Sequence, residues 1–237
     1  LDRSSAASDV YKRQEYGVEI IRGCELGVQG QYGEIHLLGL WLPRHSAPLD
    51  AELARLRGHR EERNLKILDR LRSIGINIGY QEVLDEAGGE SVGRPHIARV
   101  LQKRGIVSNF AQAFELYLGY YGAAYVPRTL LTPEEGVSLM ADLGAVVSFA
   151  HPMLIRCPPS WFDEIIPRLK EAGLGAIEAY HSEHSARDER FCVELAARYG
   201  LGLSGGSDYH GMAKPGVELG RGKGGLRVTV ALLDALK

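Results

Sequence analysis

Leu201-Gly202-Leu203-Ser204-Gly205-Gly206-Ser207-Asp208-Tyr209-His210 decides the fold class, because this short apolar run ends in a carboxylate and an imidazole. Barrels of alternating strands and helices carry their chemistry at such strand ends. Two further runs have this character: 145–150 ends at His151-Pro152, and 35–42 contains His36. We therefore expect five oxygen and nitrogen ligands at one mouth, enough for a metal cluster: Glu25, His36, His151, Asp208 and His210.

The order of strand-like and helical patterns predicts an α/β fold, namely a βα barrel with an insertion. Strand-like residues Val18 to Ile21 precede a glycine-rich turn at 27–33 and a second strand. Thr132-Pro133-Glu134-Glu135 predicts a capped helix start, after which helices and strands alternate, one strand covering 175–179. We expect four parts: a non-native or disordered segment at 1–14, a first barrel part at 15–50, a helical insertion at 51–133 and a second barrel part at 134–237.

Composition excludes several classes of protein. The formal net charge of -2 over 237 residues gives no general attraction to duplex DNA or to a membrane surface. Three cysteines without CxxC spacing argue against a disulfide framework and against a zinc ribbon, which favours a reducing cytoplasm. No apolar run approaches the roughly 20 residues that cross a bilayer. Oligomeric state is not indicated.

Each candidate ligand also has an ordinary structural interpretation. Asp208 and His210 can point to one side of extended or turn backbone, but Asp208 can equally form a turn with its neighbours. A histidine that ends a strand, such as His151, is more often a loop or packing residue. Glu25 fits a solvated loop acid, and His36 fits a half-buried strand histidine bonded to backbone. These alternatives stay open at the level of the residues.

Two other segments carry candidate substrate-binding residues. Gly93-Arg94-Pro95-His96 opens a helix, where main-chain amides favour anions, so Arg94 and His96 suit a phosphate as well as an ordinary capped helix. His181, Glu183 and His184 follow the strand at 175–179. We expect these loop side chains to be solvated, although His184 could reach a substrate phosphate.

The sequence resembles the PHP (polymerase and histidinol phosphatase) superfamily in five motifs that occur in the order typical of that family. Within it, the likeness is to the branch of nucleoside-3',5'-bisphosphate phosphatases and the related short-RNA 5'-3' exonuclease. It covers about Tyr16 to Leu226. The motifs are Gly23-Cys24-Glu25-Leu26, Glu34-Ile35-His36-Leu37-Leu38-Gly39, Gly93-Arg94-Pro95-His96-Ile97-Ala98, Phe149-Ala150-His151-Pro152 and Gly205-Gly206-Ser207-Asp208-Tyr209-His210-Gly211.

The resemblance implies a distorted (β/α)7-type barrel interrupted by a helical insertion. It implies that the five candidates above are ligands of divalent metal ions, with Glu25 able to bridge two of them. The ion expected is Mn2+, with Zn2+ or Fe2+ as alternatives, and two or three ions in a complete protein. Arg94, His96 and His184 would contact the substrate, a nucleoside 3',5'-bisphosphate or the 5' end of a short RNA, whose phosphate ester would be hydrolysed.

The chain departs from the family pattern near its start. A His-x-His strand followed by an acidic residue, and a later Asp-His pair, are absent from the sequence. We therefore expect a barrel incomplete at its N-terminus, with residues 1–14 a foreign junction or a native disordered tail, and with impaired activity. Two alternatives are a histidinol-phosphate phosphatase, against which the Gly-Arg-Pro-His-Ile-Ala segment speaks, and a non-catalytic fragment that binds metal or nucleotide.

Overall fold

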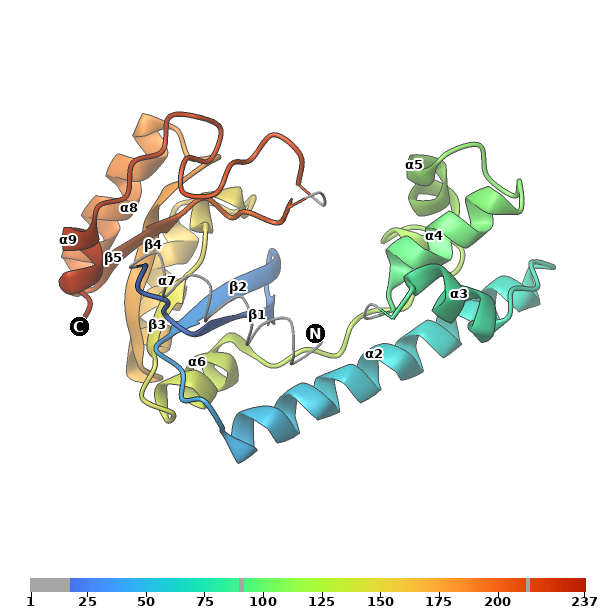
Figure 1. Cartoon of the computed structure of the whole chain (residues 1–237), viewed down its shortest axis with the longest axis horizontal. Coiled ribbons are helices and arrows are strands. Elements are labelled where there is room, and N and C mark those ends of the chain that lie inside the picture. The colour runs from blue at the N-terminus through green and yellow to red at the C-terminus, as the bar shows by residue number, and fades with distance from the viewer. Residues whose placement is uncertain (1–17, 90–91, 212–213) are drawn as a thin grey trace. The chain divides into compact units, whose positions relative to one another are not determined.

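The computed structural model describes residues 18–89, 92–211 and 214–237, in two compact units (Figure 1). One unit contains the described residues of 50–129 and is helical. The other contains the described residues of 18–49 and 130–237 and is built around a sheet. The expectation for residues 1–14 lies outside the described residues.

A mixed five-stranded sheet with the order β1-β2-β3-β4-β5 forms the second unit (Figure 1). The first three strands pair antiparallel and the last three pair parallel. The strands are β1 (Gly23–Gly30), β2 (Gly33–Leu40), β3 (Val146–Phe149), β4 (Leu174–His181) and β5 (Gly202–Gly206). The predicted α/β class is confirmed, while the strand expected at Val18 to Ile21 is wrong, because the first ladder begins at Gly23.

The hairpin of β1 and β2 has one apolar and one polar face, because side chains alternate along a strand. Leu26, Val28, Ile35 and Leu37 are buried on the apolar face. Helix α6 (Pro133–Ala141) packs against this hairpin. The predicted cap of α6 is confirmed: the Glu135 N–H donates to Thr132 Oγ1 at 3.2 Å, and the Thr132 N–H donates to Glu135 Oε2 at 2.8 Å.

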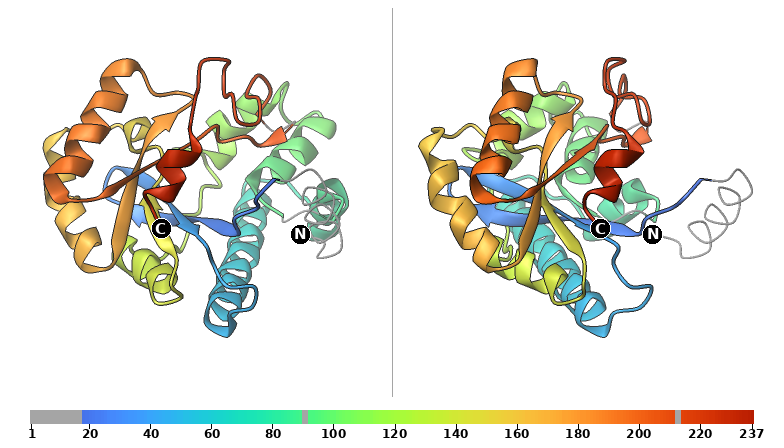
Figure 2. Two further views of the ribbon diagram at one scale, coloured as in Figure 1. Left: turned by 60° about the vertical axis from the view of Figure 1, so that its left-hand side comes forward. Right: turned by 90° about the vertical axis from the view of Figure 1, so that its left-hand side faces the viewer.

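Helices connect the parallel strands, as expected for βα units. Figure 2 shows β4 and β5 with α8 beside them. The helices of this half are a 3-10 turn η2 (Pro152–Leu154), α7 (Ser160–Glu171), α8 (Ala186–Tyr199) and α9 (Val230–Asp234). β4 extends two residues beyond the predicted strand, to His181. The carboxyl ends of β3, β4 and β5 therefore carry the residues of interest.

The helical unit has its own core, which includes Ile67, Leu71, Ile97, Leu101 and Leu118. Its elements are α2 (Ala47–Ser73), α3 (Tyr80–Ala87), α4 (Arg94–Lys103), α5 (Phe110–Ala113) and a π-helical turn η1 (Phe114–Leu118). Among the described residues, no helix combines the length and the apolar character that a membrane span requires.

Candidate metal centre

Glu25 and His36 meet on the polar face of the β1–β2 hairpin. Glu25 is paired with Leu38 and Gly27 with His36, so Glu25 and His36 are diagonal neighbours on one face. Gly27 has no side chain between them. Glu25 Oε1 lies 2.6 Å from His36 Nδ1. The register of the two strands, and not closeness in the sequence, brings these two side chains together.

His151 joins the pair from the end of β3. The Ala150 N–H donates to the His36 carbonyl at 3.0 Å, which fastens the strand end to β2. His151 then adopts a φ of 28°, in the left-handed region that favours glycine. Its Nε2 lies 3.2 Å from His36 Nδ1 and 3.4 Å from Glu25 Oε1.

Asp208 and His210 approach Glu25 from the loop after β5. Asp208 has a positive φ of 53°. His210 Nδ1 lies 3.0 Å from Asp208 Oδ1. Two groups of potential ligand atoms result, each within 4.8 Å: Glu25 with His36 and His151, and Glu25 with Asp208 and His210. The structure thus brings together all five residues singled out in the sequence, with Glu25 common to both groups.

The charges of this centre are coupled. Hydrogen bonds from His151 and His36 hold the pKa of Glu25 well below its usual range. Hydrogen bonds to Glu25 and Glu34 raise the pKa of His36 to about 9. Burial raises the pKa of Asp208, but the hydrogen bond and the charge of Lys214 together with the charge of His210 outweigh it, so the pKa is lowered. Ionised carboxylates therefore dominate the centre at neutral pH.

Two buried residues beneath the centre, Glu178 and His181, were not among the predicted ligands. Glu178 in β4 is 4% exposed, and its Oε2 accepts the His151 main-chain N–H at 2.7 Å. Burial raises the pKa of Glu178 to about 7. The expectation that His181 is solvated is wrong: it ends β4 and is 2% exposed. The available signal was the nearly continuous apolar run Ala176-Ile177 and Ala179 around Glu178, which is typical of a parallel strand that is covered on both faces.

The hydrogen bonds of His181 and His184 indicate opposite neutral tautomers. The Glu183 N–H donates to His181 Nδ1 at 3.1 Å, so Nε2 carries the proton. His184 Nδ1 lies 2.8 Å from the Ala179 carbonyl, so it carries the proton and Nε2 has the lone pair. Burial lowers both pKa values, that of His181 to about 4. Both Nε2 atoms are buried and have no hydrogen-bond partner among the described residues.

Lys214 binds the side of Asp208 that faces away from His210. Its Nζ lies 2.6 Å from Asp208 Oδ2 and 3.0 Å from Glu183 Oε1. His181 Nε2 lies 3.7 Å from the same Oδ2. The two oxygens of Asp208 therefore have different neighbours: Oδ1 faces His210, and Oδ2 faces Lys214 and His181.

Arg94 and His96 belong to the helical unit. Arg94 Nη1 donates to the Leu118 carbonyl at 3.0 Å, and the guanidinium lies 5.6 Å from the centre of the Phe114 ring. His96 is 7% exposed, and its Nδ1 accepts the Gly93 N–H at 3.1 Å within the helix cap. The predicted helix start with Pro95 in its first turn is confirmed.

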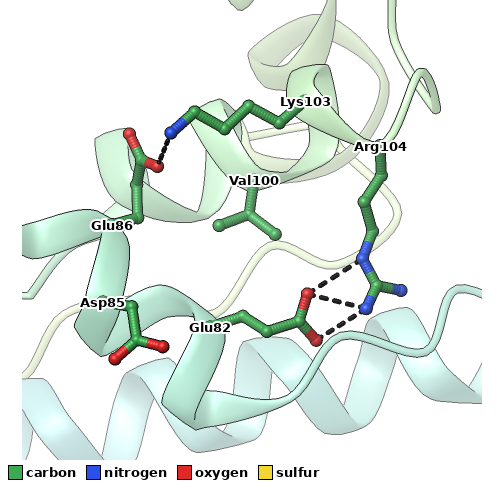
Figure 3. Close-up of a pocket in the computed structure, with 6 residues that line it drawn as sticks. All are labelled: Glu82, Asp85, Glu86, Val100, Lys103 and Arg104. Atoms are coloured by element: carbon green, nitrogen blue, oxygen red, sulfur yellow. Dashed lines mark hydrogen bonds and ion pairs between the residues drawn. The ribbon is translucent and has the colours of Figure 1, made fainter.

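The helical unit also contains a cavity of about 350 Å³ between α3 and α4 (Figure 3). Among its lining residues, Lys103 Nζ lies 2.5 Å from Glu86 Oε2, and Arg104 Nη2 lies 2.6 Å from Glu82 Oε2. Because these carboxylates are already paired with cationic side chains, the cavity is a weaker candidate for a ligand site than the carboxylate and imidazole centre.

Comparison with known proteins gives relatives with one kind of chemistry. No protein-family model matches the chain. A 5'-3' exoribonuclease of Haemophilus influenzae is 29% identical over 197 residues, which cover 83% of this chain and 72% of the relative. A 3',5'-nucleoside bisphosphate phosphatase of Chromobacterium violaceum is 27% identical over 205 residues, covering 86% of this chain and 72% of the relative. Both relatives are phosphoesterases of nucleotides or RNA.

A solved structure has the same fold over nearly the whole chain. A protein from Bifidobacterium adolescentis, described as a metal-dependent phosphoesterase, superposes with a TM-score of 0.77 at 26% sequence identity. The superposition covers 97% of this chain and 80% of the other.

Proposed function

The chain belongs to the PHP superfamily of metal-dependent phosphoesterases, and from this premise we propose that it hydrolyses a phosphate ester of a nucleotide. The substrate class is a nucleoside 3',5'-bisphosphate or the 5' end of a short RNA. The observation that carries the proposal is the convergence of carboxylate and imidazole ligand atoms from three other segments on Glu25.

The donor set fits divalent cations. Mixed carboxylate and imidazole ligands suit Mn2+, Zn2+ and Fe2+, of which we propose Mn2+. His36 and His151 would hold one cation with Glu25, and Asp208 and His210 would hold a second with the same carboxylate. When bound, such cations supply the Lewis acidity that neutralises charge on phosphoryl oxygens.

The surrounding residues of the chain orient these ligands. Glu178 holds the main chain of His151 and thereby aims its imidazole at Glu25. Lys214 binds Asp208 Oδ2 and leaves Oδ1 directed toward His210. Partners of this kind fix the orientation of ligands in metalloenzymes. Beside them, His181 carries a proton on Nε2, close to Asp208.

Substrate contacts are proposed for Arg94, His96 and His184. Arg94 donates one N–H to the Leu118 carbonyl. It is the strongest candidate of the three for phosphate binding, because a guanidinium has further donors. His96 contributes its Nδ1 to its own helix cap. The lone pair of His184 is on a buried Nε2, so acceptance from a substrate hydroxyl would require its surroundings to open, and donation to phosphate would in addition require a protonated ring.

Phosphate release in the presence of added Mn2+ tests the proposed function. The substrates are adenosine 3',5'-bisphosphate, a 5'-phosphorylated short oligoribonucleotide and histidinol phosphate. We expect turnover of one or both nucleotide substrates above that of histidinol phosphate, and loss of turnover with a chelator. Faster turnover of histidinol phosphate would contradict the substrate class.

Matched variants separate the centre from the rest of the chain. Glu25→Gln removes the carboxylate shared by both ligand groups, whereas His59→Gln changes a histidine on α2 outside them. We expect Glu25→Gln to abolish both Mn2+ binding and turnover and His59→Gln to change neither. Metal binding without turnover of any phosphate ester would favour a binding fragment over an enzyme.

A cytoplasmic location remains part of the proposal. It is supported by the three cysteines, Cys24, Cys157 and Cys192, which are all free thiols in the structure.

A further inference from the structure

Tyr120 and Tyr121 are adjacent aromatic side chains that the helical unit leaves in solvent, 71% and 95% exposed. Their rings form a T-shaped pair with centroids 4.9 Å apart, and Tyr120 also lies 5.3 Å from the ring of Tyr125. Large aromatic side chains usually have much of their surface buried in a folded unit. A neighbouring pair held in solvent therefore suggests a binding function.

The segment 118–126 that carries these rings has a tightly fixed backbone. The Gly122 N–H donates to the Gly119 carbonyl at 2.9 Å. A Cβ on Gly119 would lie 2.6 Å from the Phe114 carbonyl oxygen, and one on Gly122 would lie 2.4 Å from the Tyr117 carbonyl carbon. Only glycine fits at these two close approaches. The two tyrosines therefore project from a turn whose backbone conformation is fixed.

Three guanidinium groups bind main-chain carbonyls at the two ends of this segment. The pairs are Arg94 with Leu118 at 3.0 Å, Arg63 with Val126 at 2.8 Å, and Arg70 with Tyr125. These contacts fasten the turn, and the exposed Arg70 also keeps positive charge at the Tyr125 end of the segment. Planar guanidinium groups bind phosphate oxygens well, which suits a ligand that has both flat rings and phosphates.

We propose that Tyr120 and Tyr121 form a stacking platform for an unpaired base of a short single-stranded RNA. Every base has a π-face, so such a platform binds RNA with little sequence preference, while cationic side chains follow the phosphates. The inference rests on the proposed function and deepens it, because a base beyond the reacting nucleotide makes an oligoribonucleotide the substrate.

Equilibrium binding of a fluorescent, 5'-phosphorylated short oligoribonucleotide, measured without added metal so that it stays intact, tests the platform. We expect the double variant Tyr120→Ala/Tyr121→Ala to bind about tenfold or more weakly, and Tyr120→Phe/Tyr121→Phe to stay within about twofold of the parent chain. An oligomer with abasic sugars in place of nucleosides should bind the parent chain and the alanine variant equally.

Leu116→Ala is the matched control, because Leu116 is an exposed apolar residue of the same region, 44% exposed, without an aromatic ring. Equal RNA affinity of the alanine variant and the parent chain would overturn the platform, even if phosphate esters are hydrolysed. The platform would also be overturned if the alanine variant differed from the parent chain only in self-association, measured by sedimentation, and not in RNA binding. Base-dependent binding without hydrolysis of any substrate would uphold the platform and reject the proposed function.

Discussion

The buried carboxylate of Glu178 accepts a hydrogen bond from the main-chain N–H of His151 at 2.7 Å. His151 has a φ of 28°, a strained conformation for a residue with a side chain, and this contact helps to hold it there. The turn directs the imidazole back toward Glu25 and His36 instead of along β3. A residue in the middle of β4 thus sets the position of a side chain at the end of β3.

Replacement of Glu178 by alanine is expected to weaken Mn2+ binding about 10- to 100-fold, as loss of an outer partner does at other metal sites. The His151 N–H would also lose its acceptor, at a cost of about 1–3 kcal/mol in the free energy of unfolding. Calorimetric titration with Mn2+ and urea denaturation measure the two effects. Glu178→Gln keeps an acceptor oxygen and should lie between the alanine variant and the parent; alanine behaving like the parent would disprove the role.

Lys214 gives a prediction with a definite sign. If it orients Asp208, Lys214→Met should weaken Mn2+ binding about 10- to 100-fold at the Asp208 and His210 side of the centre. If instead the ammonium competes with the cation for Asp208, the same variant should bind Mn2+ more tightly, and our interpretation would be wrong. Lys223→Met is the control, because among the described residues the Lys223 Nζ pairs only with Glu183 Oε1, at 3.9 Å. Metal titration of both variants distinguishes the outcomes.

Local sequence was sufficient for the residues at strand ends. His151-Pro152 and Asp208 follow short apolar runs directly, and a strand that must end there leaves these side chains at the sheet edge whatever the rest of the fold. The α6 start was also predictable, since Thr132 and Glu135 form a capping box from residues three positions apart.

Long-range pairing decided what local sequence could not. Residues 27–33 were expected to form a turn, but Gly27 and Gly30 continue the ladder opposite β2, so Glu25 lies inside β1. His181 was expected in solvent, but β4 continues past the predicted strand and pairs His181 with Gly206 of β5, and the side chain is buried. Neither the register nor the strand order is written in the neighbouring residues.

The ion pair of Glu82 and Arg104 predicts an acid-sensitive contribution to stability (Figure 3). The Gly79 N–H and then Arg104 lower the pKa of Glu82 from its ordinary value of 4.5. A lowered pKa means that the contribution is complete above about pH 4.5 and is lost as the pH falls through the folded-state value. The pair is exposed, so the effect should be at most about 1 kcal/mol and smaller in high salt.

Urea denaturation of the parent and of Glu82→Gln checks this dependence. The two stabilities should differ at about pH 7 and converge as the pH falls through the lowered folded-state pKa of Glu82, below which the parent carboxylate is also neutral. Asp85→Asn is the control, because Asp85 bonds the neutral side chain of Gln81 and no cation among the described residues. A difference that grows on acidification would contradict the sign.

Two helical glycines should respond oppositely to alanine, because one faces the sheet and the other faces open space. A Cβ on Gly136 of α6 would lie 2.5 Å from Val28 Cγ1 and 3.1 Å from Leu37 Cδ1, whereas nothing lies within 4 Å of one on Gly58 of α2. Gly58→Ala should stabilise the chain by about 0.4–1 kcal/mol through helix propensity and a less flexible unfolded state. For Gly136→Ala the same gain is opposed by overpacking of about 1–3 kcal/mol, since β-branched Val28 cannot rotate freely in the hairpin core. Denaturation midpoints of the two variants test the contrast, and stabilisation by Gly136→Ala would show that α6 does not pack on β1 and β2 this closely.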